Sequence, residues 1–199
     1  MELLLIRHAL PLRVEVAEGE VADPPLAPRG HEQAEALAGV LVEEDIGLLY
    51  ASPMCRARQT AAHVAERLGL DVRIDPDLAE FDRQSHFYVP IEELRREGGD
   101  RWDDLVAGRW GPGGEADPAT FKAVVVDAFE RIVVANPGRR VAVICHGGVI
   151  NAYLSHVIGA RDLMFFEPAY AGISRLLASS AGKRQIKSIN EHAHVRALL

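Results

Sequence analysis

The sequence contains little of what marks several classes of protein. Only two of its 199 residues are cysteines, so the chain has no disulfide framework and a reducing, cytoplasmic location is expected. No apolar run approaches the roughly 20 residues of a membrane span. The apolar run near the N-terminus, residues 3–6, is too short for a signal peptide. These absences predict a soluble intracellular protein that does not bind membranes.

Positive charge is also not in excess. The chain carries 22 lysines and arginines against 29 aspartates and glutamates, which gives a net charge of -7. This acidic balance argues against broad binding to nucleic acids or anionic membranes. It still allows a small anionic ligand, because a few arginines held close together can bind one inside an acidic protein.

The eight histidines show no metal-ligand spacing. Neither H-x-x-E-H nor H-E-x-x-H occurs, and no two cysteines lie close together in the sequence. Cys145 adjoins His146, but successive side chains of a strand point to opposite faces, so we assign this cysteine a buried structural role. We expect no metal and no other cofactor.

Strands and helices alternate along the chain. Short apolar runs indicate strands at residues 3–6, 46–52, 70–74, 141–145, 171–179 and 185–189. Helical spacing of apolar residues indicates helices at residues 30–44, 53–68, 118–135 and 147–158. For the second helix we expect Ser52 as the N-cap, Pro53 at the first position and Gly69 just past the end.

This alternation predicts an α/β fold, a three-layer sandwich with a mostly parallel central sheet flanked by helices. Residues 1–199 are expected to form one domain. Within it, residues 80–118 change in composition and are expected to form a small cap insertion with a short helix near residues 90–97. Trp102 and Trp110 either line a substrate pocket there or pack within the cap.

Polar side chains follow three of the predicted strands. Arg7 and His8 end the first strand, Arg56 lies one helical turn beyond the second, and His146 follows strand 141–145. Ligands of parallel α/β sheets bind outside the carboxyl ends of the strands. If these strands are neighbours, the four side chains meet near helix N-termini, where a phosphate dianion is well held. Arg58 is better explained as a solvated helix charge.

Six segments, taken together and in order, carry a family resemblance. They are "LLLIRHA" (3–9), "LAPRGHEQA" (26–34), "YASPMCRARQTA" (50–61), "LAEFD" (78–82), "VAVICHGGVI" (141–150) and "SINEHAHV" (188–195). The chain therefore resembles the histidine phosphatase superfamily, which includes the cofactor-dependent phosphoglycerate mutases and many phosphatases. The resemblance implies a phosphoglycerate mutase-like fold.

The resemblance also implies roles for individual residues. His8 would be the nucleophile, with Arg7 and Arg56 binding the phosphoryl group. His146 would be the second histidine of the site, and Gly147 would offer its backbone N–H to the phosphate.

The acid of the reaction is assigned to the segment around residue 80. Glu80 would donate a proton to the leaving group, and Asp82 is a nearby alternative. The implied reaction is metal-independent hydrolysis of a phosphate monoester through a phosphohistidine.

The sequence departs from the family after the signature histidine. Ala9 stands where glycine is usual, and the following "LPLRVE" lacks the small polar residues and the asparagine that the mutases carry there. Arg13 is a candidate replacement for these ligands. The departures favour a phosphatase over a phosphoglycerate mutase.

Two alternatives stay open beside the phosphatase. One is a non-catalytic phosphate- or phosphoprotein-binding module on the same fold, and the other is a phosphoglycerate mutase. The expected partner is a small-molecule phosphate ester. Residues 10–28 and 80–118 are expected to determine which ester is bound. A homodimer through an edge strand or helix is compatible with the pattern.

Overall fold

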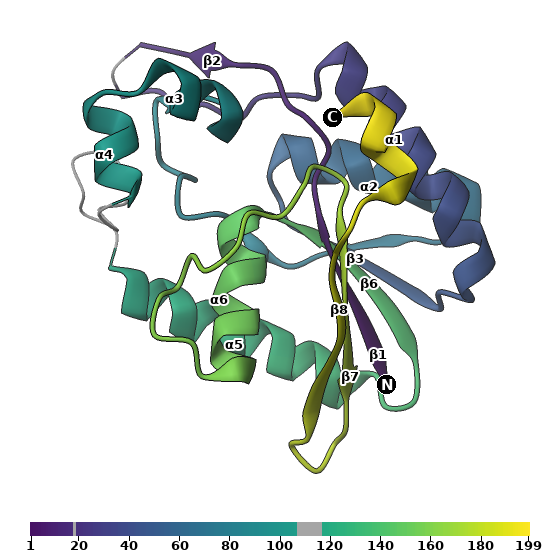
Figure 1. The fold of residues 1–199 in the computed structure, drawn as a ribbon. Helices are drawn as coiled ribbons and strands as arrows, with labels where there is room; N and C mark the ends of the chain where they lie inside the picture. The colour runs from purple at the N-terminus through teal and green to yellow at the C-terminus, as the bar shows by residue number, and fades with distance from the viewer. Residues whose placement is uncertain (18, 107–116) are drawn as a thin grey trace.

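A sheet covered by helices on both faces forms the centre of the molecule (Figure 1). The structure is a computed structural model that describes residues 1–17, 19–106 and 117–199. Six strands pair in the order β4-β3-β6-β1-β7-β8. Their bounds are β1 Glu2–Arg7, β3 Leu48–Ala51, β4 Val72–Ile74, β6 Arg140–Cys145, β7 Ile173–Ala178 and β8 Arg184–Glu191. The pairs β4-β3, β3-β6 and β6-β1 are parallel, and β7 and β8 join antiparallel, so the predicted mostly parallel sheet is confirmed.

Two pairs of helices form the outer layers. On one face lie α1 (Pro28–Leu41) and α2 (Cys55–Leu68), and on the other α5 (Pro118–Ala135) and α6 (Gly147–Ile158). Short 3-10 helices follow α1, β4 and β8: η1 Val42–Glu44, η2 Pro76–Leu78 and η4 Ala193–Leu198. Within the described residues, no helix is both long enough and apolar enough to span a membrane.

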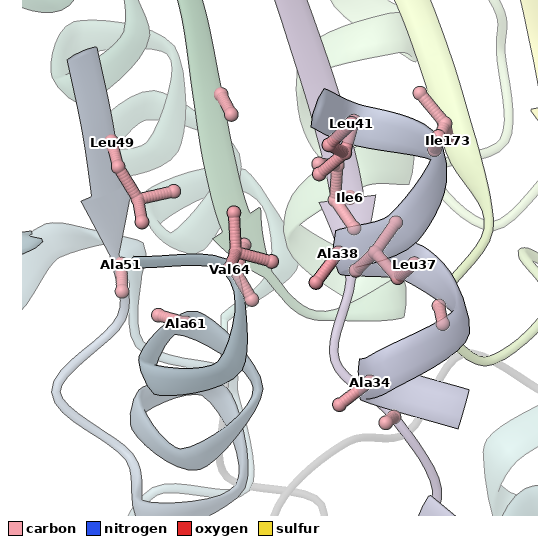
Figure 2. Close-up of a cluster of buried hydrophobic side chains, with 14 of the residues drawn as sticks. Ile6, Ala34, Leu37, Ala38, Leu41, Leu49, Ala51, Ala61, Val64 and Ile173 are labelled. Carbon is pink, nitrogen blue, oxygen red and sulfur yellow. The ribbon is translucent and has the colours of Figure 1, made fainter. Parts of the chain in front are cut away.

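The central strand β1 is buried on both faces. Leu3 and Leu5 pack in the cluster under α5 and α6, whereas Leu4 and Ile6 pack in the cluster under α1 and α2. Figure 2 shows this second cluster, with Ile6 beside Leu37 and other side chains of α1. Burying such a side chain stabilises the fold by about 1.5–3 kcal/mol. The double burial explains why this strand has no alternation of polar and apolar residues.

The strand order places three carboxyl ends side by side. Strands β3, β6 and β1 are neighbours, as the placement of the polar residues required. The backbone hydrogen bonds between these strands continue beyond the strand ends. The His8 N–H donates to the Cys145 carbonyl at 2.9 Å, and the Ser52 N–H donates to the Ile144 carbonyl at 3.0 Å. The side chains that follow these strands therefore lie at one edge of the sheet.

The predicted start of the second helix was wrong. Helix α2 begins at Cys55, and the residue before it, Met54, has extended backbone. The Ser52 hydroxyl does not cap the helix, because it lies 2.7 Å from the ring of His146. The Cys55 N–H finds its acceptor elsewhere, in the Asp23 carboxylate at 2.8 Å.

The described part of the predicted cap contains three short elements: β5 Phe87–Tyr88, α3 Ile91–Glu97 and α4 Asp100–Val106. The predicted helix near 90–97 corresponds to α3. The segment 10–28 is not only a loop, because its strand β2 (Val14–Glu15) pairs antiparallel with β5. Trp110 lies outside the described residues.

Candidate active site

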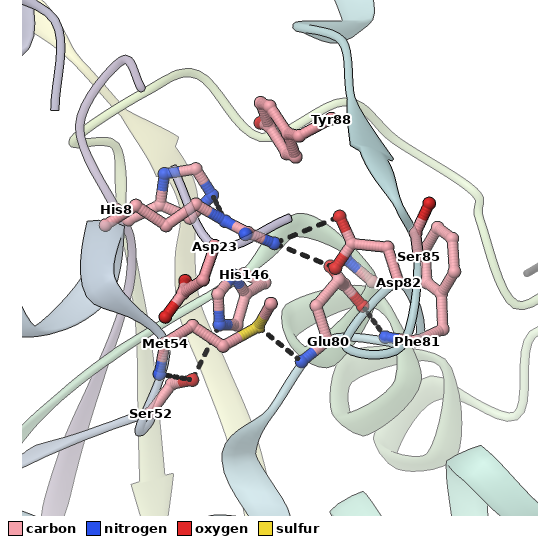
Figure 3. Close-up of polar contacts among 12 residues, drawn as sticks. His8, Asp23, Ser52, Met54, Glu80, Phe81, Asp82, Ser85, Tyr88 and His146 are labelled. Atoms are coloured by element: carbon pink, nitrogen blue, oxygen red, sulfur yellow. Dashed lines mark hydrogen bonds and ion pairs between the residues drawn. The ribbon is translucent and has the colours of Figure 1, made fainter. Parts of the chain in front are cut away.

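The predicted site residues come together at the carboxyl edge of the sheet, and Figure 3 shows His8, Glu80 and His146 among them. The side chains of Arg7, His8, Arg56, Glu80 and His146 are almost fully buried. All of these residues except His146 line a cavity of about 740 Å³. We call the following group the pocket floor: Arg7, His8, Arg56, Glu80, His146 and Gly147.

The geometry of His8 places the lone pair on one ring nitrogen, Nε2. Its Nδ1 lies 2.8 Å from the Ala9 carbonyl oxygen, which can only accept, so the proton is on Nδ1 and the lone pair on Nε2. Burial, with Arg56 and Arg7 nearby, holds the pKa of His8 well below its usual value, so the ring is neutral. Ala9 is not among the described residues with positive φ, so this position does not need glycine.

Arg56 of α2 is oriented by a carboxylate. Its Nη2 donates to both oxygens of Asp82, at 2.9 and 3.1 Å, and its Nε–H points to His8 Nε2 at 3.3 Å. The guanidinium lies 4.6 Å from the centre of the Tyr88 ring. Asp82 is thus engaged in holding Arg56, which leaves Glu80 as the acid candidate.

Arg7 is fixed from the other side of the floor. Its Nη1 donates to the Pro168 carbonyl at 2.6 Å, and its guanidinium stacks on the Tyr170 ring at 3.7 Å. The flat ring supports the guanidinium without using the N–H groups at its edge.

Ser52 contacts the ring of the second histidine. Its hydroxyl oxygen accepts from the Met54 N–H at 3.3 Å and lies 2.7 Å from His146 Nε2. When the hydroxyl donates its proton to His146 Nε2, the ring N–H is on Nδ1. The two histidine rings meet edge to face, with their centres 5.0 Å apart.

Three buried nitrogens around His8 have no hydrogen-bond partner. Among the described residues, the buried side-chain nitrogens and oxygens without a hydrogen bond are Arg7 Nε, Arg56 Nη1 and His146 Nδ1. Each such group costs about 1–3 kcal/mol when left unpaired. Three unpaired donors in one place, two of them charged, form a site for an anion.

Glu80 is a buried carboxyl at the edge of this group. Its oxygens accept from the Phe81 N–H at 3.0 Å and the Gly148 N–H at 2.7 Å. Burial, together with the charge of Asp82, raises the pKa of Glu80 to about 7. A carboxyl with this pKa exists in both protonation states near neutral pH, as a general acid and base requires.

Gly148 was not identified from the sequence, although it supports Glu80. A Cβ atom at this position would lie 2.3 Å from Glu80 Oε1. Only glycine therefore lets the carboxyl reach the N-terminus of α6. The second glycine of "CHGG" was the available signal.

Other residues singled out from the sequence lie apart from the floor. Arg13 pairs with Glu97 and with Glu93, at 3.6 Å from the latter, and does not reach the cavity. Arg58 is exposed on α2. Cys145 is buried, and burial raises the pKa of its thiol, which keeps it protonated. No group of three or more His, Cys, Asp or Glu side chains in the described ranges could hold a metal ion.

Comparison with known proteins gives a family match over nearly the whole chain. The model of the "Histidine phosphatase superfamily (branch 1)" matches residues 3–192. Phosphoserine phosphatase 1 of Hydrogenobacter thermophilus is 33% identical over 95 residues, which are 47% of this chain and 45% of that enzyme. The match thus spans less than half of the relative's length. Putative phosphoserine phosphatase 2 of the same organism is 24% identical, with 98% of each chain covered.

Solved structures share the fold. A phosphoserine phosphatase from Entamoeba histolytica, bound to 3-phosphoglyceric acid, superposes with a TM-score of 0.76 at 20% identity and covers 98% of each chain. A mycobacterial glucosyl-3-phosphoglycerate phosphatase gives a TM-score of 0.75 at 22% identity, covering 96% of this chain and 99% of that one.

Proposed function

Since the chain belongs to the histidine phosphatase superfamily (branch 1), we propose that it is a phosphatase that hydrolyses a small phosphate monoester through a phosphohistidine on His8. Relatives named as phosphatases, among them a glucosyl-3-phosphoglycerate phosphatase from Mycolicibacterium vanbaalenii that is 29% identical over 147 residues, support the activity. That match covers 69% of this chain and 64% of that enzyme.

One observation carries the proposal. The unpaired donors Arg7 Nε, Arg56 Nη1 and His146 Nδ1 surround a histidine that carries its lone pair on Nε2, where the Arg56 Nε–H donates to it at 3.3 Å. A phosphoryl group keeps its negative charge on three equatorial oxygens during transfer. Donors already in place at those oxygens stabilise the transition state without reorganisation.

In the first step, His8 Nε2 attacks phosphorus, a P–N bond forms and the bond from phosphorus to the ester oxygen breaks. The alcohol oxygen leaves with the bonding electrons and takes the proton of Glu80. A binding protein would need no neutral, tautomer-fixed histidine at this point, since any donor would hold the phosphate.

In the second step, water attacks the phosphohistidine and its proton passes to the Glu80 carboxylate. The P–N bond breaks, the lone pair returns to His8 Nε2, and inorganic phosphate leaves. Glu80 acts as acid and then as base, which its pKa of about 7 permits. The scheme uses no metal.

Several further expectations stay predictions. These are the cytoplasmic location, the single domain with its cap, the lack of a cofactor, the lack of nucleic-acid and membrane partners, and the homodimer. Arg13 does not replace the polar ligands missing after His8, because it pairs with Glu97 outside the floor. The absence of these ligands supports a phosphatase rather than a mutase.

The test is turnover of p-nitrophenyl phosphate and propyl phosphate in EDTA, with 3-phosphoglycerate and a bisphosphoglycerate primer in parallel. We expect release of inorganic phosphate from both esters and no 2-phosphoglycerate. Primer-dependent isomerisation would identify a mutase instead. Binding of inorganic phosphate with no hydrolysis of any ester would leave the phosphate-binding module as the function.

A further inference from the structure

The cavity above the floor is much larger than a phosphate needs. Its volume of about 740 Å³ lies within the range of pockets that enclose a whole drug-sized ligand. Most of the side chains above the floor are apolar or aromatic. We call six of them the pocket wall: Phe87, Leu94, Trp102, Met164, Phe165 and Phe166.

The wall keeps apolar surface in contact with solvent. All six side chains are only partly buried, and they come from four separate segments of the chain. Apolar groups gathered in a concave, half-open patch are a binding surface for apolar matter.

Two wall phenylalanines are held firmly by a buried side chain. Asn151 of α6 accepts from the N–H groups of Phe165 and Phe166, at 3.1 and 3.2 Å, and donates to the Phe166 carbonyl at 3.0 Å. The same amide donates to the Gly147 carbonyl at 2.9 Å. Wall and floor are therefore tied to one another before any ligand arrives, which lowers the entropic cost of binding.

The arginines of the wall region are already neutralised. Arg95 pairs with Glu167 and lies 5.4 Å from the Trp102 ring. Arg101 lies 3.5 Å from Glu15 and stacks on Phe87 at 4.0 Å. Within the described residues, each arginine that lines the cavity above the floor thus has a carboxylate partner.

A further carboxylate lies near the floor. Glu92 stands 3.9 Å from Arg7, and Glu167, the partner of Arg95, lines the cavity. A substrate carboxylate entering here would meet like charge and would have to break an existing ion pair to gain a cation. Phosphoserine and phosphoglycerates carry such a carboxylate.

We propose that the wall selects phosphate monoesters whose alcohol part is uncharged and apolar or aromatic, so that the organic group lies on the rings of Phe166 and Trp102 while the floor holds the phosphate. This inference rests on the proposed phosphatase function for its kinetic readout. It names the substrate class that the site takes.

The direct test compares four esters of primary alcohols that differ in the distal group. They are propyl phosphate, 3-phenylpropyl phosphate, the phosphate ester of 4-hydroxybutanoate and that of 3-(trimethylammonio)propanol. We expect kcat/KM for the phenylpropyl ester to exceed that for propyl phosphate by about 10- to 100-fold. The carboxylate ester should fall below propyl phosphate. A preference for the carboxylate or the ammonium ester, or a phenylpropyl-to-propyl ratio near one, would overturn the inference.

Variants of the wall locate the selectivity. Phe166→Ala and Trp102→Ala should each lower the phenylpropyl-to-propyl ratio of kcat/KM by about three- to tenfold. The Phe166 substitution keeps the backbone bonds to Asn151. Val134→Ala, at a side chain that is 72% exposed on α5, is the matched control and should leave the ratio as it is.

A second variant tests the charge argument. Glu167→Gln frees Arg95 from its ion pair and should raise kcat/KM for the carboxylate ester, relative to that for propyl phosphate, by about two- to fivefold. No gain would contradict the view that paired arginines exclude carboxylates.

Binding of non-hydrolysable esters separates this inference from the proposed function. 3-Phenylpropylphosphonate should bind more tightly than propylphosphonate by calorimetry, and Phe166→Ala should reduce the difference. Equal affinities would refute the wall inference even if both phosphates are hydrolysed. Selective binding without any hydrolysis would support the wall inference and refute the phosphatase.

Discussion

The floor and the wall of the pocket differ in the hydrogen-bond donors that they leave unused. In the floor, Arg56 pairs with Asp82 and Arg7 lies 3.9 Å from Glu92, yet Arg7, Arg56 and His146 each keep one buried nitrogen without a partner. In the wall region, Arg95 and Arg101 are paired with carboxylates and rest on rings. Unpaired buried donors form a site that binds and polarises an anion, whereas paired charges and half-buried rings form a site for apolar matter.

This difference indicates that the floor and the wall of the pocket have separate functions. The floor carries the chemistry, so a change there should lower the rate for every ester by a similar factor. The wall chooses the alcohol, so a change there should alter ratios between esters. The predictions below test this division at the floor.

The largest effect is expected for His8→Ala. Loss of the nucleophile should reduce kcat/KM for propyl and 3-phenylpropyl phosphate alike, by on the order of 10⁴-fold or more. Steady-state kinetics with both esters measures it, with His156→Ala on the exposed side of α6 as the matched histidine control. Hydrolysis by the His8→Ala variant at the wild-type rate would contradict the mechanism.

Glu80→Gln should have the next largest effect, and the effect should depend on the leaving group. For propyl phosphate, kcat/KM should fall by about 10²- to 10⁴-fold, because the alkoxide needs a proton. For p-nitrophenyl phosphate the fall should be much smaller, because p-nitrophenolate leaves without one. Equal losses for both esters would argue against Glu80 as the acid and would direct the search to Asp82.

The pH dependence of the wild-type enzyme sharpens the same point. The pKa of Glu80 is raised to about 7, and the acid form is the active one in the first step. Above pH 7, kcat/KM for propyl phosphate should therefore fall about tenfold per pH unit, and Glu80→Gln should remove this limb. A flat profile up to pH 9 in the wild type would contradict the assignment.

Arg56→Lys should lower kcat/KM by about 10²- to 10³-fold for both alkyl esters. Lysine cannot reproduce the planar fork that contacts Asp82 with one nitrogen and offers another to the phosphate. Arg58→Lys, two residues along the same helix and exposed, is the matched control and should change the rate less than twofold. A change in the ratio between esters would show that Arg56 belongs to substrate choice.

The smallest floor effect is expected for Ser52→Ala. Without the hydroxyl, His146 loses the hydrogen bond at its Nε2, and kcat should fall about tenfold. Nitrogen-15 spectra of the histidines should show Nδ1 protonated in the wild type and a mixture of tautomers in the variant. An unchanged tautomer together with reduced activity would mean that Ser52 acts only through packing.

The floor could be predicted from the sequence because strand order follows from local patterns. A run such as residues 3–6, buried on both faces, indicates a central strand, and polar residues at the ends of parallel strands share one edge. Arg7, His8, Arg56 and His146 were placed together on that ground, and the structure has them there.

The wall and the supporting contacts could not be predicted in the same way. Phe165 and Phe166 lie in a loop without periodicity, and their position depends on a bond to Asn151, far away on α6. Ser52 was misassigned because serine before proline fits a helix cap, and only the fold reveals that His146 uses its hydroxyl. Such contacts are tertiary, so no local pattern records them.

The most direct test of the central claim is to trap the phosphoenzyme on His8. Glu80→Gln should accept phosphate quickly from p-nitrophenyl phosphate and release it slowly, because the base for the attacking water is gone. Quenching this variant during turnover in EDTA should give one acid-labile, base-stable phosphoryl group per chain, which mass mapping places on His8 and which is absent from the Glu80→Gln, His8→Ala double variant. A phosphoryl group on another residue, or continued turnover of the double variant with no phosphoenzyme, would contradict the account.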